Sequence, residues 1–199
     1  MKRLSFFFIS TIIFLHTSFL HSYSSDPKNF IEELVNEAIN TLSNKDLDKD
    51  VKSKLIEKIA LENVDIDALG LYTLGELRKS SSKQTIAKYQ IAFEKYFLKT
   101  LTSRLTDYSS SQFEIIDVDK KSSNYTIINS KVSPTDGSPE IKIDWRVYTK
   151  NPDKPLIRDL IVEGLSLART QKEEFTSILS SNNNEIEILI GKLEEFVKN

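Results

Sequence analysis

The 199-residue chain contains no cysteine, and its two histidines, His16 and His21, both lie within the first 24 residues. Without cysteine the chain can form neither a disulfide nor a thiolate nucleophile. Beyond residue 24 it also lacks the ligands of a Cys/His zinc site and the base of a Ser-His-Asp triad. An exported domain of this composition must therefore be stabilised by packing alone.

The N-terminus has the pattern of a targeting segment. Two basic residues precede an apolar stretch over 4–20, and Ser22 and Ser24 supply small residues at the −3 and −1 positions of a cleavage site. A stretch of about 17 residues is marginal for crossing a bilayer. We therefore predict a cleaved signal peptide over residues 1–24, with a retained membrane anchor as the alternative.

The remaining residues, 25–199, have the length of a single domain with a substantial core. Because Lys2 and Arg3 leave with the signal peptide, the formal charge changes from −2 to −4. No block of like charge stands out in this part, which argues against a nucleic-acid surface.

Helices dominate the first half of this domain. Asp26-Pro27 is a good helix start, Val51 opens a second apolar pattern, and Asp65 is placed to cap a third segment. Ser81-Ser-Lys-Gln84 has the form of a capping box and opens the longest helix, which is predicted to end near Leu105.

The period changes to two after Gln112, and strands are predicted at 113–118, 125–132, 141–148 and 156–162. The third predicted strand alternates most clearly. One face of that strand carries Ile141, Ile143, Trp145 and Val147. Short turns between sequential strands predict an antiparallel meander.

Two helices are predicted to end the chain. Gly164 breaks the last strand, Thr170-Gln-Lys-Glu173 reads as another capping box, and a final apolar pattern starts at Ile186. The sequence therefore predicts an α+β fold: N-terminal helices, a four-stranded antiparallel sheet, and two C-terminal helices packed on one face. Periodicity alone leaves open whether that face encloses a solid core or a cavity.

Several of these segments match the motifs of one family. Asp65–Gly70 is an acid-apolar-Leu-Gly segment, Gln84 and Phe93 lie on the long helix, and Val162–Ser166 is a Val-Glu-Gly-x-Ser strand end with Phe175 beyond it. In these features the chain resembles the MlaC family, the periplasmic auxiliary component of toluene-tolerance and lipid-transport ABC systems. The Val-Glu-Gly-Leu-Ser piece is the most specific, and the spacing agrees over essentially the whole domain.

The resemblance implies a periplasmic phospholipid carrier rather than an enzyme, with lipid as cargo and neither cofactor nor metal. It implies a monomer that exchanges lipid between an outer-membrane lipoprotein–porin complex and an inner-membrane ABC transporter with an MCE-type protein. Such exchange maintains the lipid asymmetry of the outer membrane. It also implies that the sheet and helices surround an apolar cavity.

On this interpretation the bulky apolar residues of the long helix and the sheet are candidates for the cavity wall. The predicted lipid-binding residues are Leu69, Leu74, Phe93, Phe97, Leu101, Ile115, Ile128, Ile143, Trp145, Val147, Leu160 and Val162. Without the resemblance, the same residues would be assigned to an ordinary packed core.

Other functions are possible on the residues alone. A filled core would make the chain a non-catalytic periplasmic interaction module. A hydrolase using only carboxylates would need converging acids, but pairs such as Glu173-Glu174 are adjacent on a helix and point apart. Ser166 lacks the second glycine of a nucleophile elbow.

Two acids on and after the last predicted strand, Asp159 and Glu163, have two possible roles. Both contact a partner, or Asp159 is paired within the chain and Glu163 is solvated.

Overall fold

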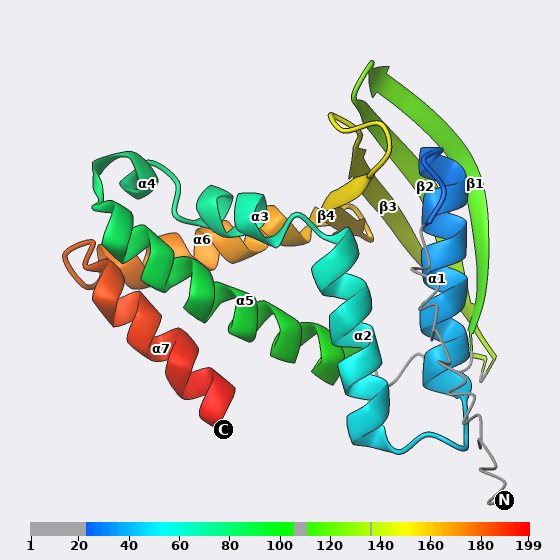
Figure 1. Ribbon diagram of the computed structural model, residues 1–199, viewed down its shortest axis with the longest axis horizontal. Helices are drawn as coiled ribbons and strands as arrows, with labels where there is room; N and C mark the ends of the chain where they lie inside the picture. The colour runs from blue at the N-terminus through cyan, green and yellow to red at the C-terminus, as the bar shows by residue number, and fades with distance from the viewer. Residues whose placement is uncertain (1–22, 106–110, 136) are drawn as a thin grey trace, which may run out of the picture.

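The computed structural model describes residues 23–105, 111–135 and 137–199, and in that part of the chain it contains seven helices and a five-stranded antiparallel sheet (Figure 1). The helices before the sheet are α1 (Pro27–Ser43), α2 (Lys49–Asn63), α3 (Ile66–Thr73), α4 (Leu77–Ser80) and α5 (Lys83–Leu105). The strands are β1 (Ser111–Ser122), β2 (Tyr125–Pro134), β3 (Ile141–Tyr148), β4 (Leu156–Val162) and β5 (Leu165–Ser166), and the last helices are α6 (Leu167–Ser180) and α7 (Ile186–Lys198). The predicted α+β class is confirmed. The predicted signal peptide lies outside the described residues apart from Tyr23 and Ser24.

The helix starts follow local signals in the sequence. The Asp26 side chain accepts hydrogen bonds from the backbone N–H groups at the start of α1, where Pro27 occupies the first turn. Asp65 caps α3 in the same way, and Ser82 Oγ accepts from Thr85 N at the start of α5. Each oxygen satisfies a backbone donor that the helix itself leaves unpaired.

The sheet runs in the order β1-β2-β3-β4-β5, so neighbours in sequence are neighbours in space. Ile128 lies opposite Trp145, and Thr126 lies opposite Val147. Residues that face each other across a ladder share one face of the sheet. The predicted inward face of β3 is therefore the inward face of the sheet as well.

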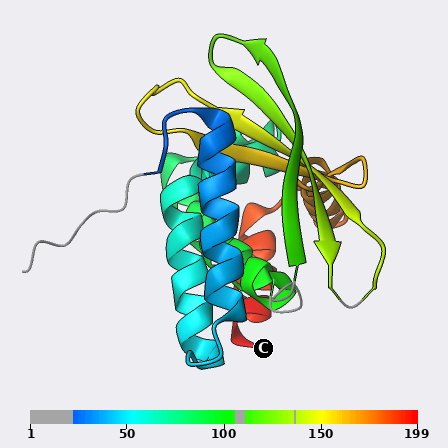
Figure 2. The same cartoon turned by 90° about the vertical axis from the view of Figure 1, so that its right-hand side faces the viewer.

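The N-terminal helices cover this inward face, and α1 lies along the sheet in both views (Figures 1 and 2). We call the buried residues between α1, α2 and the sheet the first core. They are Phe30, Ile31, Leu34, Val35, Leu42, Ile56, Ile59, Ile128, Trp145, Val147 and Ile157.

A second core lies away from the sheet, among α3, α5, α6 and α7. Its buried residues are Ile66, Leu74, Tyr89, Ala92, Phe93, Phe175, Leu179, Ile186, Leu189, Ile190 and Leu193. The C-terminal helices pack mainly on α5 and α3, and α6 also contacts β4 and β5. The expectation that both would pack over the sheet is wrong in this detail, because α5 presents the aromatic rings that their apolar faces cover.

The sheet differs from the prediction in the bounds of β1 and β2, since β1 begins two residues earlier and β2 ends two residues later than predicted, and in its number of strands. β1 continues to Ser122, four residues beyond the predicted end, because its ladder to β2 persists as far as the Ser122–Tyr125 pair despite two bulges. A fifth strand, two residues long, follows β4. Glu163 and Gly164 both have positive φ angles, 50° and 80°, and this tight turn folds the chain back beside β4.

The start of α6 also differs from the prediction. The helix begins at Leu167 with Ser166 as its N-cap, and the predicted capping box at Thr170 lies inside it. Ser166 Oγ accepts from Arg169 N, and Thr170 Oγ1 donates to the Ser166 carbonyl. Ser166 therefore takes the role that the sequence pattern assigned to Thr170.

Glycine at position 70 is expected to be required for the packing of α3 on α5. A Cβ there would lie 2.9 Å from Phe93 Cδ1, inside the second core. We expect Gly70→Ala to lower the free energy of unfolding by about 1–3 kcal/mol through overpacking. Urea denaturation measures this change.

Gly191 provides the matched control, because it lies within α7 and a Cβ there would meet no atom within 4 Å. Gly191→Ala is expected to raise the free energy of unfolding by about 0.5–1 kcal/mol through helix propensity. Equal effects of the two substitutions would contradict the proposed close contact at Gly70.

Candidate functional site

The twelve predicted wall residues do not form one surface. Ile128, Trp145 and Val147 are buried in the first core, where Leu101, Ile115, Ile143 and Leu160 pack half-buried against them. Leu74 and Phe93 are buried in the second core, with Leu69 and Phe97 half-buried at its edge. Val162 is half-buried and belongs to neither set. The sheet residues and Leu101 are therefore the group that the fold brings together.

Burial decreases along the inward face of β3, from its middle towards the end where this strand begins, whereas Ser130 and Val132 on the neighbouring β2 stay buried. In the middle, Ile128 and Val147 are completely buried and Trp145 is 9 % exposed. One ladder step towards that end, Ile143 lies between Ser130 and Val162, and both Ile143 and Val162 are half-buried. At this end of the sheet the apolar side chains of β3 and β4 are thus only partly covered by the chain itself.

The C-terminal half of α5 adds apolar residues to the edge of the first core. Leu101 and Leu105 are half-buried against the first core, whereas Phe97 and Leu98 are half-buried against the second. Half-exposed apolar side chains that adjoin a core mark a place where further hydrocarbon can be buried. We call this set the half-buried cluster: Leu101, Leu105, Phe113, Ile115, Ile143 and Leu160.

Two members of the half-buried cluster, Leu105 and Phe113, were not predicted as wall residues. Phe113 packs edge-on to Trp145, with ring centroids 6.3 Å apart. It lies two residues before Ile115 on the same strand, so period-two alternation offered a signal for it. Leu105 belongs to the same helical stripe as Leu101, which was predicted.

Trp145 has a polar anchor within this apolar face. Its indole Nε1–H donates to Ser130 Oγ at 2.9 Å, and Ser130 Oγ donates to the Ile143 carbonyl at 2.8 Å. Buried polar atoms are stable only when they are paired in this way. The pairing fixes the orientation of the ring on the inward face and leaves its apolar edges as the contact surface.

The second core is tightly packed around aromatic rings. Phe93 stacks on Tyr89 and Phe97 and meets Phe175 edge-on. The Tyr89 hydroxyl pairs with Thr73 Oγ1 at 2.7 Å. Burial raises the pKa of the Tyr89 phenol well above its usual value of about 10, so the group stays neutral. This core is therefore suited to stabilising the helices rather than to holding a ligand.

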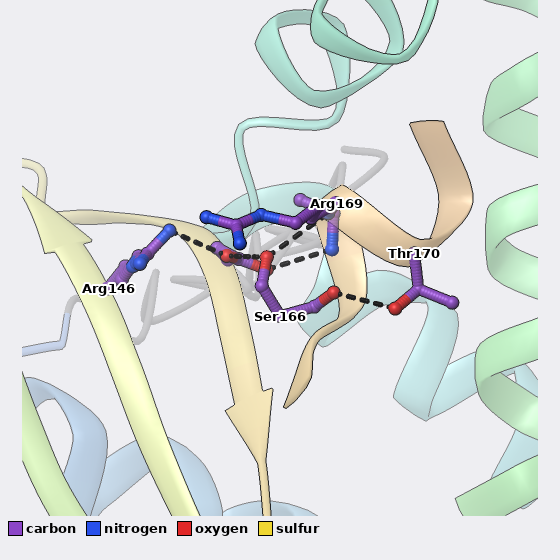
Figure 3. Close-up of polar contacts among 6 residues, drawn as sticks. Arg146, Ser166, Arg169 and Thr170 are labelled. Atoms are coloured by element: carbon purple, nitrogen blue, oxygen red, sulfur yellow. Dashed lines mark hydrogen bonds and ion pairs between the residues drawn. The ribbon is translucent and has the colours of Figure 1, made fainter. Parts of the chain in front are cut away.

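A buried carboxylate connects the sheet to the start of α6 (Figure 3). Asp159 accepts from Arg146 Nη1 at 3.0 Å, from Ser166 Oγ at 2.6 Å and from Ala168 N at 2.9 Å. Its side chain is 4 % exposed, whereas that of Arg146 is 33 % exposed. A desolvated charge of this kind needs all of its partners, and here they come from three elements. Of the two alternatives given for Asp159, a contact for a partner protein or an acid paired within the chain, the structure shows the paired acid.

Arg158 and Glu163, near Asp159 in the sequence, form further contacts between elements of the fold. Arg158 binds Asp65 through Nε at 2.8 Å and Nη2 at 2.7 Å, and its guanidinium lies 3.7 Å from the centroid of the Tyr148 ring. Glu163 is exposed, and its carboxylate accepts from Lys142 N at 2.5 Å, which closes the turn before β5. Asp159 and Glu163, the two acids considered as partner contacts, therefore both have structural partners within the chain.

A separate groove of about 460 Å³ lies on the outside, between α3 and α6. It is lined by Tyr72, Arg169, Lys172, Glu173 and Thr176. None of the predicted wall residues lines it, and its charged lining does not suit an acyl chain. The elongated apolar cavity that the resemblance implies stays a prediction, with the half-buried cluster as its place in the fold.

Among the described residues, no group of three or more His, Cys, Asp or Glu side chains could hold a metal ion. In the same part of the chain, no helix has both the length and the hydropathy needed to cross a bilayer.

The chain is similar to one protein family and to a solved structure. The family model described as MlaC protein matches residues 32–195. The fold is similar to that of a phospholipid-binding protein from Ralstonia solanacearum solved in complex with a phospholipid, with a TM-score of 0.74 and 17 % identity over 86 % of this chain and 96 % of that one. No curated protein sequence matches the chain. At this identity the structural likeness establishes the fold and not the ligand.

The Asp159 network yields a prediction about stability. Asp159→Ala leaves Arg146 without its carboxylate and removes the acceptor for Ala168 N. Breaking a buried pair on one side costs about 3–5 kcal/mol, so we expect a loss near the lower end, because Arg146 is partly solvated. Chemical denaturation of the variant measures the loss.

Asp117→Ala serves as the control, since Asp117 is an exposed aspartate on β1. A change within about 0.5 kcal/mol is expected there. If both alanine variants unfolded at the same denaturant concentration, the Asp159 network would not be holding α6 on the sheet.

Proposed function

The chain belongs to the MlaC protein family, and from this premise we propose that it is a periplasmic phospholipid carrier. In this role it moves lipid between an outer-membrane lipoprotein–porin complex and an inner-membrane ABC transporter that includes an MCE-type protein. The transport maintains the lipid asymmetry of the outer membrane. The protein acts by binding and not by catalysis.

One observation in the fold supports the proposal most directly. The half-buried cluster offers apolar side chains from three strands, β1, β3 and β4, and from α5, next to a buried core. The structural relative from Ralstonia solanacearum, named a phospholipid-binding protein, supports the choice of ligand. The acyl chains would extend over the Ile143 and Val162 row, towards Trp145.

The energetics of a lipid carrier agree with such a site. A two-chain lipid has about thirty methylene groups, and exposing them to water costs roughly 24 kcal/mol at ~0.8 kcal/mol per group. The carrier must offset most of this cost with apolar surface and must still be able to release the lipid. An apolar surface that the chain leaves half-exposed at one end of a rigid sheet can meet both demands.

A carrier in the periplasm must be exported, and the signal peptide is part of the proposal. We expect the exported protein to begin at Ser25, after the small residues Ser22 and Ser24. N-terminal sequencing of protein recovered from the periplasmic fraction tests this. Protein that retained Met1 and sedimented with membranes would instead indicate an anchor.

The proposal predicts that the exported protein carries phospholipid and that Ile143 borders it. Mass spectrometry of an organic extract should detect phospholipid in stoichiometric amount. Ile143→Trp places a bulky ring in the half-buried row and should exclude an acyl chain, because the row has no space for both. We expect co-purified phospholipid to fall at least about fivefold while the far-ultraviolet circular dichroism stays unchanged.

Ile127→Trp is the matched control, because Ile127 is also half-buried but pairs with Arg146 on the other face of the sheet. It should leave the lipid content unchanged. Trp145 is the only tryptophan in the unsubstituted chain, so its emission gives an independent readout when the lipid is stripped. A lipid-free extract from folded protein, with a filled core, would favour the interaction module instead.

A further inference from the structure

One row of side chains crosses all five strands of the sheet on its inward face. In strand order its members are Ile115, Ser130, Ile143, Val162 and Leu165, and each is paired with the next. Paired residues point to the same side of a sheet, and neighbouring strands lie about 4.8 Å apart, so these side chains are adjacent. We call them the cross-sheet row. Its middle is the part of the sheet that we assign to the acyl chains.

Burial along the cross-sheet row falls towards β5. Ser130 is 1 % exposed, whereas Ile143 and Val162 are half-buried. Leu165 is 68 % exposed, more than any other large apolar side chain in the described part of the chain. Burial also falls along β3, from Trp145 to Ile143. Both trends lead to the same corner of the sheet, where β3 begins and β5 forms the edge.

The turn that precedes Leu165 is fixed to the start of β3. Glu163 and Gly164 have φ angles of 50° and 80°, the pattern of a type I′ turn in a two-residue hairpin. A positive φ strains a glutamate, and its surroundings must hold it. Glu163 N donates to the Lys142 carbonyl at 3.0 Å, and the Glu163 carboxylate accepts from Lys142 N at 2.5 Å. These bonds keep Leu165 at the half-buried end of the row.

We propose that Leu165 binds the acyl chains of the phospholipid where they leave the protein, so that the mouth of the lipid site lies at the β5 hairpin. The inference rests on the proposed function and adds a residue and a direction to it. A lipid on Ile143 and Val162 keeps its headgroup in water, so its headgroup end lies where the row is least covered. That end is Leu165, two strand spacings or about 10 Å from Ile143.

The composition of the row favours an acyl chain over a partner protein as the cover of Leu165. The residues that dominate protein interfaces are Trp, Tyr and Arg, and Leu is under-represented among them. From β3 to β5 the row contains only Ile, Val and Leu. An acyl chain that continues along the row covers Ile143, Val162 and Leu165 together, which matches their gradual loss of burial.

The inference also gives a role to each residue of the Val-Glu-Gly-Leu-Ser segment. Val162 and Leu165 form the apolar end of the row, and Glu163 with Gly164 makes the turn between them. Ser166 ends the hairpin and caps α6. The segment is therefore the rim of the lipid site, held by β3 on one side and by α6 on the other.

The test measures how a phospholipid with a fluorescent acyl chain distributes between the exported protein and phosphatidylcholine vesicles. Leu165→Ser removes the apolar side chain at the mouth and should shift the distribution about tenfold towards the vesicles. Leu165→Met keeps an apolar side chain of similar volume, so this variant should behave like the unsubstituted protein. Because Leu165 is mostly exposed, both variants should keep the urea midpoint of the unsubstituted protein.

Ile91→Ser is the matched control, because Ile91 is 60 % exposed on α5 and lies outside the row. It should leave the distribution unchanged. An unchanged distribution for Leu165→Ser would overturn the inference but not the carrier proposal, and is the result expected if a partner protein contacts Leu165 instead. An equal shift for Ile91→Ser would also overturn it. If the unsubstituted protein bound no phospholipid, the inference and the carrier proposal would both fail.

Discussion

The arrangement of the molecule depends on one buried carboxylate. Asp159 joins a side chain of β3, the hydroxyl that ends β5 and the backbone at the start of α6. Because the group is almost completely desolvated, its charge is stable only while all three partners stay in place. The direction of α6 is fixed in this way, and α6 carries Phe175 and Leu179 into the second core. A contact that belongs to neither core therefore helps to fix their relative position, together with the Arg158–Asp65 pair and α5.

A bulge explains how an apolar strand can supply such a group. Arg146 pairs with Asp159 and Val147 pairs with Ile157, so Arg158 is the extra residue in β4. The extra residue changes which side chains face inward, and Ile157 and Leu160 both pack with the first core although they are three residues apart. It also lets two consecutive polar residues bind different helices, since Arg158 reaches the cap of α3 while Asp159 accepts a hydrogen bond from Ala168 N in the first turn of α6.

Features that depend on a few consecutive residues were predictable, and features that depend on distant ones were not. The helix cap at Asp65 was predicted correctly because it follows from local hydrogen bonding. The inward face of β3 was predicted correctly because it follows from period-two alternation. The start of α6 was placed at Thr170 because the sequence cannot reveal that Ser166 has a distant carboxylate to fix it. The wall residues were likewise predicted as one set, since periodicity identifies an apolar face but not the element that covers it.

Under the proposed function, the separation of the two cores resolves a conflict that a lipid carrier faces. Apolar surface that binds cargo cannot at the same time contribute its full burial energy to the fold, because the chain must leave it open. Here the aromatic packing of Phe93 against Tyr89 and Phe175 lies in the second core, away from the sheet. The half-buried cluster can therefore remain incompletely covered while α5, which spans both regions, holds it in position. Under the proposed function, loading and release of lipid would change the coverage of the first core and leave the packing of the second unchanged.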